Sequence, residues 1–323
     1  MAACVKQGSA LHPPEEAPPP LDSSAKGLSP FGNTMLASTP YSFAGHLVIH
    51  GTMPNNDQPN DHDATQAFLE SLPELKTGET FQFACHPGVP CFNACCSDLS
   101  LMLTPYDVLR LRGRLKLAGR EFMERYAVTA PAPDTGFPMA RLRMREDLPG
   151  APCPFVRREG CSVYADRPGA CRTYPLGRAT RPVGEGKADA GDVTEQFFIV
   201  QESHCRGFEA GPAWSAPEWL GDQDLKEYNR QNDRLMLLLA RLKGAETRLT
   251  PKQGSMAFLA LYTVDAFGSF LSDTGMLEKL ELTDAKRADI LSDEARRLEF
   301  AVDWLTLALF GASRNLKRKP ADT

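Results

Sequence analysis

The distribution of cysteine constrains this chain more than any other feature. Eight of its nine cysteines lie between residues 85 and 205, and residues 206–323 contain none. Small core residues scattered for packing would not gather in one part of a sequence. In a reducing compartment, clustered thiols bind metal more often than they form disulfides. The sequence therefore predicts a metal site built from the clustered thiols Cys85, Cys91, Cys95, Cys96, Cys153, Cys161, Cys171 and Cys205.

The N-terminus and the hydropathy pattern predict a cytoplasmic protein. Residues 1–20 contain no apolar stretch of the kind that a secretory signal requires. No run of eighteen apolar residues exists, so we expect no membrane-spanning helix. Thiols stay reduced in the cytoplasm, which leaves a disulfide framework as the less favoured alternative.

The amino-acid composition limits the kinds of binding partner that we expect for this protein. A hydrophobic content of 42% can supply a core, and the net charge of -5 argues against binding to nucleic acid through bulk charge. We therefore expect a metal ion or cluster as the partner, with no nucleic acid and no membrane. A protein partner stays open.

The amino-acid composition and the spacing of apolar residues change twice along the chain. Residues 1–40 are rich in Pro, Ser, Gly and Ala, a composition typical of a disordered arm. Residues 41–212 hold the cysteines in a loop-rich segment, and residues 213–323 follow with apolar residues at helical spacing. We predict an α+β fold: an irregular cysteine-cluster domain with short helices and few strands, followed by a C-terminal helical region packed on it.

One helix start is clear in the sequence. Thr104 can cap a helix, Pro105 suits its first position, and Asp107 completes a capping box. We expect this helix to run to about residue 118 and to end at Gly119. Periodicity predicts further strands at 41–52, 81–84, 141–146 and 191–203, helices at 64–75, 119–127, 217–243, 251–272 and 283–311, and a frayed basic tail after residue 313.

The adjacent pair Cys95 and Cys96 bears on the number of metal centres. Neighbouring side chains project in different directions, so these two thiols are poorly placed to bind one ion together. Either one of them is a packed thiol or they serve different metals. Two four-thiolate centres is the economical count for eight cysteines. The alternative is one centre with four spectator or redox thiols.

Spacing favours an iron–sulfur cluster over zinc. Structural zinc sites commonly have two to four residues between paired ligands, and only Cys91 and Cys95 fit that spacing. The bacterial ferredoxin run is absent as well. Widely separated thiols suit a cluster assembled from several loops, so an iron–sulfur cluster of the 4Fe–4S type is the favoured cofactor and zinc the alternative.

Charged and aromatic residues flank the second group of cysteines. Four thiolates on a divalent ion carry a net charge of about -2, which nearby arginines can offset. Tyr164, Arg167, Arg172 and Tyr174 are candidates to donate hydrogen bonds to sulfur. In the structural alternative the tyrosines pack and the arginines pair with Asp or Glu, or lie on a solvated face. The arginines concerned are Arg157, Arg158, Arg167, Arg172 and Arg178.

The run of four cysteines, the following LTPYD, and CPF with GCSVY and RPGACRTYP together resemble the YkgJ-type cysteine-cluster family. The resemblance covers about residues 80–206 and implies metal chelation by a domain described as a putative zinc- or iron-chelating domain. This chain departs from the closer C-x2-C-x2-CC spacing that is common in the family. Its cysteine usage is also distantly similar to that of flagellin lysine-N-methylases.

Two function hypotheses follow. The first is a metal-binding protein whose centre is structural, electron-carrying or metal-handling. The second is an iron–sulfur metalloenzyme, either an oxidoreductase or a protein-modifying transferase such as a lysine N-methylase. The sequence identifies no catalytic residue and no cofactor-binding motif, because it contains no Gly-rich phosphate loop, no GxSxG and no HExxH.

Overall fold

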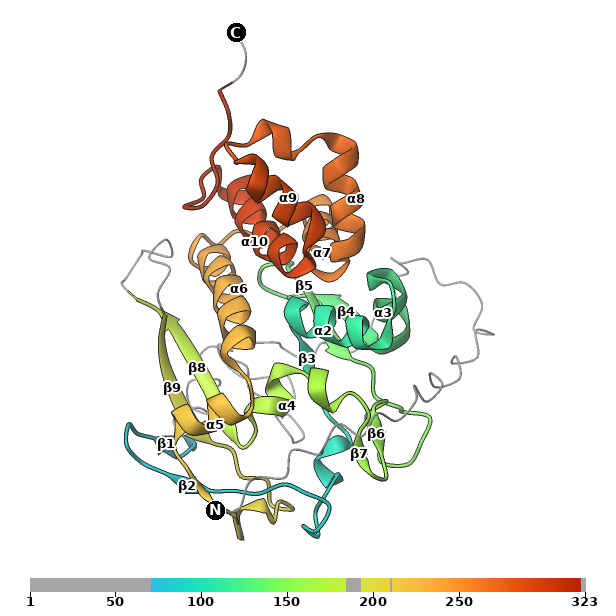
Figure 1. Cartoon of the computed structure of the whole chain (residues 1–323), viewed down its shortest axis with the longest axis vertical. Coiled ribbons are helices and arrows are strands. Elements are labelled where there is room, and N and C mark those ends of the chain that lie inside the picture. Colours follow the sequence, from blue (N-terminus) through green and yellow to red (C-terminus); the bar gives the residue numbers. More distant parts are fainter. Residues whose placement is uncertain (1–70, 184–192, 210, 321–323) are drawn as a thin grey trace. The chain divides into compact units, whose positions relative to one another are not determined.

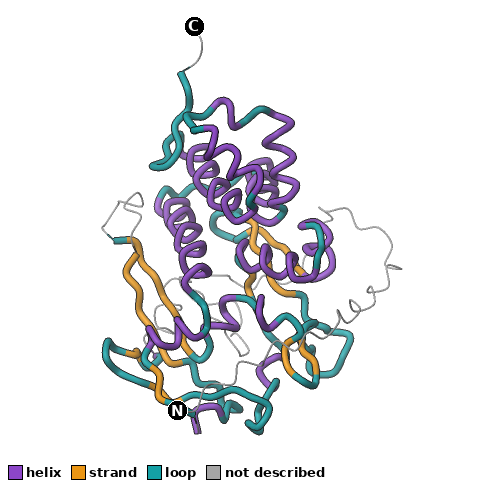
Figure 2. Tube along the Cα trace, viewed as in Figure 1, coloured by secondary structure: helices purple, strands orange, loops and turns teal. Residues whose placement is uncertain are grey.

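A computed structural model describes residues 71–183, 193–209 and 211–320, which all belong to one compact unit, Ser38–Thr323 (Figure 1). The predicted arm at 1–40, the strand predicted at 41–52 and most of the helix predicted at 64–75 lie outside the described residues. The architecture is α+β, as predicted. Short strands alternate with short helices up to residue 214, and helices predominate afterwards (Figure 2).

The strands form small antiparallel sheets, four in the described part of the chain. Two of the sheets involve segments that carry cysteines. One of them, β10 with β2, joins segments that lie far apart in the sequence, and the other, β6 with β7, is a hairpin. The sheets are β1 (Glu74–Leu75), β9 (Val193–Ile199) and β8 (Leu176–Pro182); β3 (Met102–Leu103), β5 (Pro138–Leu142) and β4 (Ala127–Pro131); β10 (Ala213–Trp214) with β2 (Phe81–Gln82); and β6 (Val156–Arg157) with β7 (Gly160–Cys161).

The strands correct two predictions. The end of the helix predicted at 64–75 is strand β1 instead, because Glu74–Leu75 pair with β9. The strand predicted at 141–146 ends at Leu142, where β5 stops pairing with β4. Its burial alternation is right, since Leu142 and Met144 are buried while Arg143 and Arg145 are exposed.

The helix start at Thr104 is confirmed, and the helix end is corrected. Helix α2 is Pro105–Leu115; its Thr104 side chain accepts from the Asp107 N–H, and the Asp107 carboxylate accepts the Thr104 N–H at 2.8 Å. Lys116, at φ 56, ends the helix in the left-handed conformation. Gly119 instead begins α3, Gly119–Tyr126, where an added Cβ would lie 2.9 Å from the Thr263 backbone.

The three long helices predicted after residue 213 are six shorter ones. Their breaks are local: Asp224 has a φ of 53, Thr263 is non-helical, and the Asp293 side chain accepts the N–H groups of residues 295 and 296 as an N-cap. The helices are α5 (Ala216–Asp222), α6 (Lys226–Gly244), α7 (Pro251–Tyr262), α8 (Val264–Thr274), α9 (Asp284–Ser292) and α10 (Glu294–Phe310).

The basic tail is also ordered over its described residues, which corrects the expectation of fraying. Leu316 is buried with 4% of its surface exposed. The Glu281 N–H donates to the Lys317 carbonyl at 2.9 Å, and the Lys319 N–H donates to the Lys279 carbonyl at 3.0 Å. Backbone pairing and one apolar anchor therefore hold this segment against residues 279–281.

One apolar core joins the two halves of the described chain. Val108 and Phe122 on α2 and α3 belong to the same buried cluster as Leu261, Phe267 and Trp304 on α7, α8 and α10. A smaller cluster lies between the sheets that contain β1 and β2, and its members are Leu75, Phe81, Phe83, Leu176, Ala216 and Trp219.

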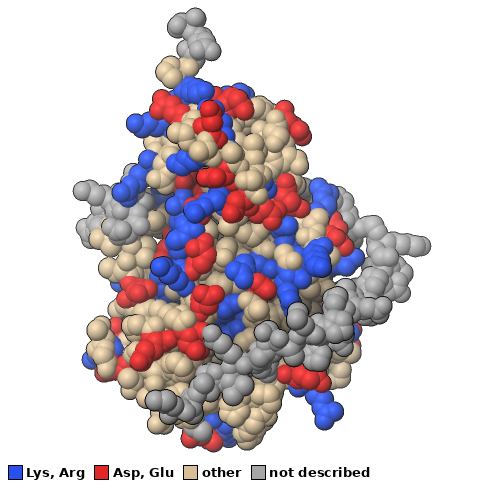
Figure 3. Space-filling model, viewed as in Figure 1, with Lys and Arg blue, Asp and Glu red and all other residues tan. Residues whose placement is uncertain are grey.

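The outer face of the helices carries charges of both signs, which intermix on the face shown in Figure 3. Arg230 pairs with Glu227 and Glu299, each at 2.6 Å, and Arg234 pairs with Asp303 at 2.7 Å. Within the described ranges, no single helix has the length and apolar composition to cross a membrane. The pair α7 and α8 has both only when taken together, and it is bent by 111°.

Candidate metal centre

All eight clustered cysteines are free thiols in this structure. Cys85 and Cys171 are exposed, and the other six are half-buried. They come from short loops, from the hairpin β6–β7, and from two short helical turns, which are the 3-10 turn Ala94–Cys96 and α4, Gly169–Thr173. The second cysteine segment therefore has more regular structure than the loop that the sequence predicted.

Long-range backbone hydrogen bonds bring the segments of Cys85, Cys91 and Cys205 together. The Ala84 N–H donates to the Gly207 carbonyl at 3.0 Å, and the Arg206 N–H donates to the Cys91 sulfur at 3.1 Å. A Cβ on Gly207 would lie 2.6 Å from the Phe83 ring, so this close approach requires glycine.

A second set of contacts brings Cys96, Cys153 and Cys161 together. The Cys153 N–H donates to the Cys96 carbonyl at 2.8 Å, and Ser97 and Pro152 form an antiparallel bridge. The hairpin β6–β7 then places Cys161 opposite Val156, three residues after Cys153.

Two further contacts fix this arrangement. The Asn93 side chain donates to the Arg157 carbonyl at 2.9 Å, which ties the first cysteine loop to the tip of the hairpin. The Asp107 carboxylate accepts the Gly169 N–H at 2.8 Å and so holds α4, which carries Cys171. Sequence reasoning identified Asp107 only as a helix cap and did not identify Asn93; the positive φ of 68 at Asn93 has no clear local signal.

The thiols interact within two sets of four, which are connected by the interaction between Cys95 and Cys96. Burial, together with the nearby charges of Cys95, Cys91 and Cys205, raises the pKa of Cys85 to about 11. Burial also raises the pKa of Cys205, which interacts with Cys91 as well. We call Cys85, Cys91, Cys95 and Cys205 the Cys205 group.

The remaining four thiols are coupled to one another in the same way. Burial raises the pKa of Cys171, and the charges of Cys153 and Cys161 add to that effect. Burial raises the pKa of Cys153 to about 11. We call Cys96, Cys153, Cys161 and Cys171 the Cys171 group. Cys171 is exposed at the surface, although the surrounding protein raises its pKa.

The two groups meet at Cys95 and Cys96. A hydrogen bond between these neighbouring thiols lowers the pKa of Cys95 to about 7 and raises the pKa of Cys96. The charges of Cys153 and Cys171 also raise the pKa of Cys96, whereas the charge of Cys95 raises the pKa of Cys85. The adjacent side chains thus belong to different groups.

Two arginines beside the thiols are buried without a carboxylate partner among the described residues. Arg167 is 8% exposed and donates to the Tyr164 carbonyl at 2.7 Å and to the Gln223 side chain. Arg172 is 5% exposed and donates to the carbonyls of Arg167, Gln223 and Ala165. The structural alternative of pairing with Asp or Glu holds for Arg178 and not for these two.

Of the other three arginines, Arg178 forms a bidentate ion pair with Asp233 and a second pair with Glu195. Arg157 and Arg158 are exposed, and the Arg157 guanidinium donates to the carbonyls of Pro154 and Val156. The alternative of a solvated face therefore applies only to Arg157 and Arg158, at the tip of the hairpin.

The two tyrosines differ in their surroundings. The Tyr174 hydroxyl is buried and has no hydrogen-bond partner of regular geometry. Burial raises its pKa, and the neighbouring Cys205 thiol raises it further. Tyr164 is 55% exposed, and the Arg167 guanidinium stacks 3.8 Å from its ring centroid. The interaction with the Tyr174 hydroxyl in turn lowers the pKa of Cys205, so Tyr174 lies within reach of the Cys205 group.

Thiols suit zinc and iron, and the buried arginines and the unpartnered hydroxyl are what an anionic thiolate centre needs around it. The side chains, however, do not converge: no three His, Cys, Asp or Glu residues in the described ranges have an arrangement that could hold a metal ion as they stand. Backbone contacts join the segments that carry Cys85, Cys91 and Cys205, and also those that carry Cys96, Cys153 and Cys161.

Residues 84–206 match a family model named CxxCxxCC and described as a "putative zinc- or iron-chelating domain". We refer to residues 84–206 as the CxxCxxCC domain, after the family model that they match. The match confirms the resemblance noted in the sequence and supports metal binding in general terms. No curated protein and no solved structure matches the chain.

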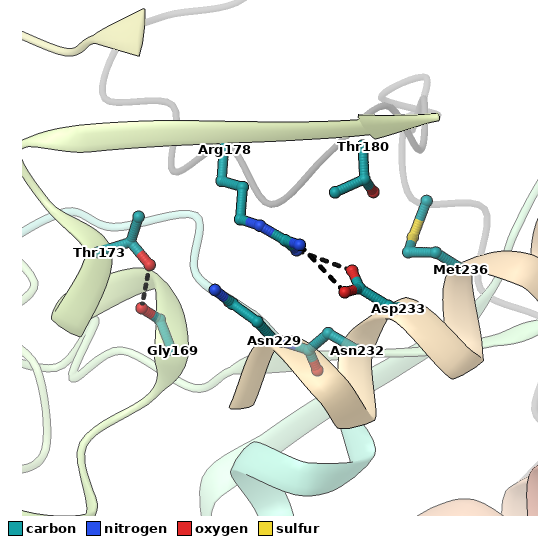
Figure 4. Close-up of a pocket in the computed structure, with 8 residues that line it drawn as sticks. All are labelled: Gly169, Thr173, Arg178, Thr180, Asn229, Asn232, Asp233 and Met236. Atoms are coloured by element: carbon teal, nitrogen blue, oxygen red, sulfur yellow. Dashed lines mark hydrogen bonds and ion pairs between the residues drawn. The ribbon is translucent and has the colours of Figure 1, made fainter. Parts of the chain in front are cut away.

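Two small cavities lie near the CxxCxxCC domain, and none of its cysteines lines either of them. The larger cavity has a volume of about 20 Å³ and lies between α4, β8 and α6. Figure 4 shows Arg178 reaching from β8 toward Asp233 on α6, with the Asn229 amide beside them. This space suits an ordered water better than a substrate.

Proposed function

We propose that this protein binds two metal centres, one in each group of four thiols. The observation that carries the proposal is the pairing of thiol segments from opposite ends of the CxxCxxCC domain, beside two buried arginines that lack a carboxylate. A buried guanidinium without an anionic partner is unfavourable. A four-thiolate centre would supply the missing negative charge.

The donor sets support an iron–sulfur cluster of the 4Fe–4S type in preference to zinc. The Cys171 group takes its thiols from three separate segments and the Cys205 group from two, which suits a cluster assembled from several loops. When bound, such a cluster can accept or donate one electron, whereas zinc would act only as a structural ion.

The protein groups around the sulfurs have specific tasks in this proposal. The Arg206 N–H already donates to the Cys91 sulfur, and the Tyr174 hydroxyl, which lies beside Cys205, would donate to its thiolate. Arg167 and Arg172 offset the charge of the thiolates. Hydrogen bonds to thiolate sulfur and nearby positive charge favour the deprotonated ligand that a metal needs.

A structural role accounts for these features with the fewest assumptions. The segments that carry the thiols are held by hydrogen bonds and turns, with few buried apolar side chains. The alternative function, an iron–sulfur metalloenzyme, needs a substrate cavity beside the thiols. Because the two cavities described above are lined by other residues, the binding-protein proposal has the better support.

Anaerobic purification of the full chain, followed by metal and acid-labile sulfide analysis, tests the proposal. We expect bound metal at two centres per chain. Iron with sulfide in equal amounts would identify iron–sulfur clusters, and zinc without sulfide would identify two zinc ions. A chain that stays folded without bound metal, and does not take up either metal under reducing conditions, would contradict the proposal.

A further inference from the structure

We infer that Asp107 is a positioning residue for the Cys171 group, because its buried carboxylate joins the start of α2 to the start of the short helix that carries Cys171. The inference rests on the proposed function and adds to it a residue that acts on one of the two centres. Asp107 acts through the backbone of α4, whose first N–H it accepts.

The Asp107 side chain is completely buried, and its two carboxylate oxygens have different partners. One oxygen accepts the Thr104 N–H and the Thr104 hydroxyl, each at 2.8 Å, and so completes the cap of α2. The other oxygen accepts the Gly169 N–H at 2.8 Å, 62 positions further along the chain. A carboxylate can accept at both oxygens at once, so one side chain connects the first turns of two helices.

The helix α4 depends on contacts of this kind. It has only five residues, and a helix of that length is not stable by itself. Cys171 is its third residue, two positions after the N–H that Asp107 accepts. The packing at its first residue is also close, since a Cβ on Gly169 would lie 3.3 Å from the Tyr228 ring. The contacts at the ends of α4 therefore determine where the Cys171 backbone lies.

The last turn of α4 is held by different residues. The Trp219 indole N–H donates to the Thr173 carbonyl at 3.0 Å, and the Arg172 guanidinium donates to the Gln223 carbonyl at 2.8 Å. Both contacts join α4 to residues 219–223, whereas Asp107 joins it to α2. Loss of the Asp107 carboxylate should therefore release the first turn of α4 while the last turn stays attached.

The Cys205 group is assembled by other contacts. Its segments are joined by the hydrogen bond from Ala84 to Gly207 and by the one from Arg206 to Cys91. Within the described ranges, the hydrogen bonds of the Asp107 carboxylate go to Thr104 and Gly169. Loss of this carboxylate should weaken metal binding at the Cys171 group only, whereas a general loss of stability would affect both centres alike.

The test measures each centre alone in the full chain. Cys91→Ser leaves only the Cys171 group with all its thiols, and Cys153→Ser leaves only the Cys205 group. Asp107→Ala is added to each, and Zn²⁺ is titrated anaerobically under reducing conditions in competition with a chromophoric chelator. With Cys91→Ser we expect Asp107→Ala to weaken binding about 10–100-fold, the range typical of groups that support metal ligands. With Cys153→Ser we expect no change in affinity.

Thr104→Ala is the matched control. It removes the hydroxyl that caps α2 but leaves the hydrogen bond between Asp107 and Gly169. It should lower the melting temperature by about 2–4 °C and leave the Zn²⁺ affinity of both centres unchanged. If Asp107→Ala weakens both centres equally, or leaves the Cys171 group as tight as before, Asp107 stabilises the fold without positioning Cys171.

A second measurement keeps Asp107 and so does not depend on the folding of its variant. Coupling between two sites is reciprocal, so Zn²⁺ at the Cys171 group should slow hydrogen exchange at residues 104–108. Zn²⁺ at the Cys205 group should not. Equal exchange of these amides with and without Zn²⁺ at the Cys171 group would also overturn the inference. Failure of the parent protein to bind metal would instead contradict the proposed function, so the two failures are distinguishable.

Discussion

The segments that carry the thiols and the helices after residue 215 are stabilised in different ways. Among the helices, Leu261, Phe267 and Ala301 are completely buried, and Phe267 packs against the rings of Phe300 and Trp304. Residues 84–98 have no buried apolar side chain, and residues 145–171 bury only Phe155, Val163 and Ala170. The helices are stabilised by their apolar core. The thiol segments are stabilised instead by hydrogen bonds and, in our proposal, by the metal that the thiols bind.

The comparison also bears on domain organisation. The shared core that includes Val108, Phe122 and Leu261 supports our proposal that the helical region, 213–323, packs on the cysteine domain at 41–212. In this arrangement the thiol segments pack on the apolar helices and contribute few buried apolar side chains themselves. The predictions below separate the two parts, from the largest expected effect to the smallest.

Removal of all metal by chelation under reducing conditions should have the largest effect. Structural zinc contributes about 10–16 kcal/mol of apparent binding free energy in small peptides, and the whole stability of a domain is about 5–15 kcal/mol. Amides at 84–98 and 151–171 should lose protection in hydrogen exchange, while those of α6 to α10 keep most of theirs. If the metal-free and metal-loaded proteins melt at the same temperature, the centres are peripheral and not structural.

Loss of a single thiol should remove one centre and leave the other. Cys161→Ser or Cys171→Ser should lower the metal content from two centres to one. The expected loss of stability is about 5–8 kcal/mol, half of the range for full removal if both centres contribute equally. Metal analysis and thermal unfolding measure the two effects. Cys4→Ser, outside the cluster, is the control and should change neither; an equal effect of Cys4→Ser would argue against the assignment.

A core substitution among the helices should show the reverse pattern. Phe267→Ala removes a completely buried ring that contacts Phe300 and Trp304, and should cost about 3–5 kcal/mol in the free energy of unfolding. The metal content should stay the same, because the rings that pack against Phe267 all belong to helices after residue 215. The exposed neighbour Ser269 supplies the control: Ser269→Ala should change stability little. Loss of metal from folded Phe267→Ala would mean that the two parts are more tightly coupled than we propose.

The smallest effect is expected at a helix cap far from the thiols. Asp293→Ala removes the side chain that accepts the N–H groups of Ala295 and Arg296 at the start of α10. The expected cost is about 1 kcal/mol in chemical denaturation, with no change in metal content. Asp289→Ala, at an exposed position of α9, should stay within about 0.5 kcal/mol of the parent protein. Equal effects of the two substitutions would show that the cap contributes nothing specific.

Much of the fold could be predicted where the signals are local. The capping box at Thr104 and Asp107 depends on residues three apart, and its prediction was right. The breaks at Asp224, Thr263 and Asp293 were missed, because apolar spacing continues across them while the backbone turns. The role of Gly119 was misjudged because its need for glycine comes from the backbone of Thr263, far away in the sequence.

The sequence alone predicts that eight thiols gather in one segment, that this segment resembles a cysteine-cluster family, and that an apolar helical region follows it. Only the tertiary structure decided which thiols lie together. The contacts of Cys96 with Cys153, and of Ala84 with Gly207, join residues more than fifty positions apart, and no local rule specifies them. Likewise, the burial of Arg167 without an anion depends on Gln223 and Tyr164, because a side chain's partners are set by packing rather than by its neighbours in the chain.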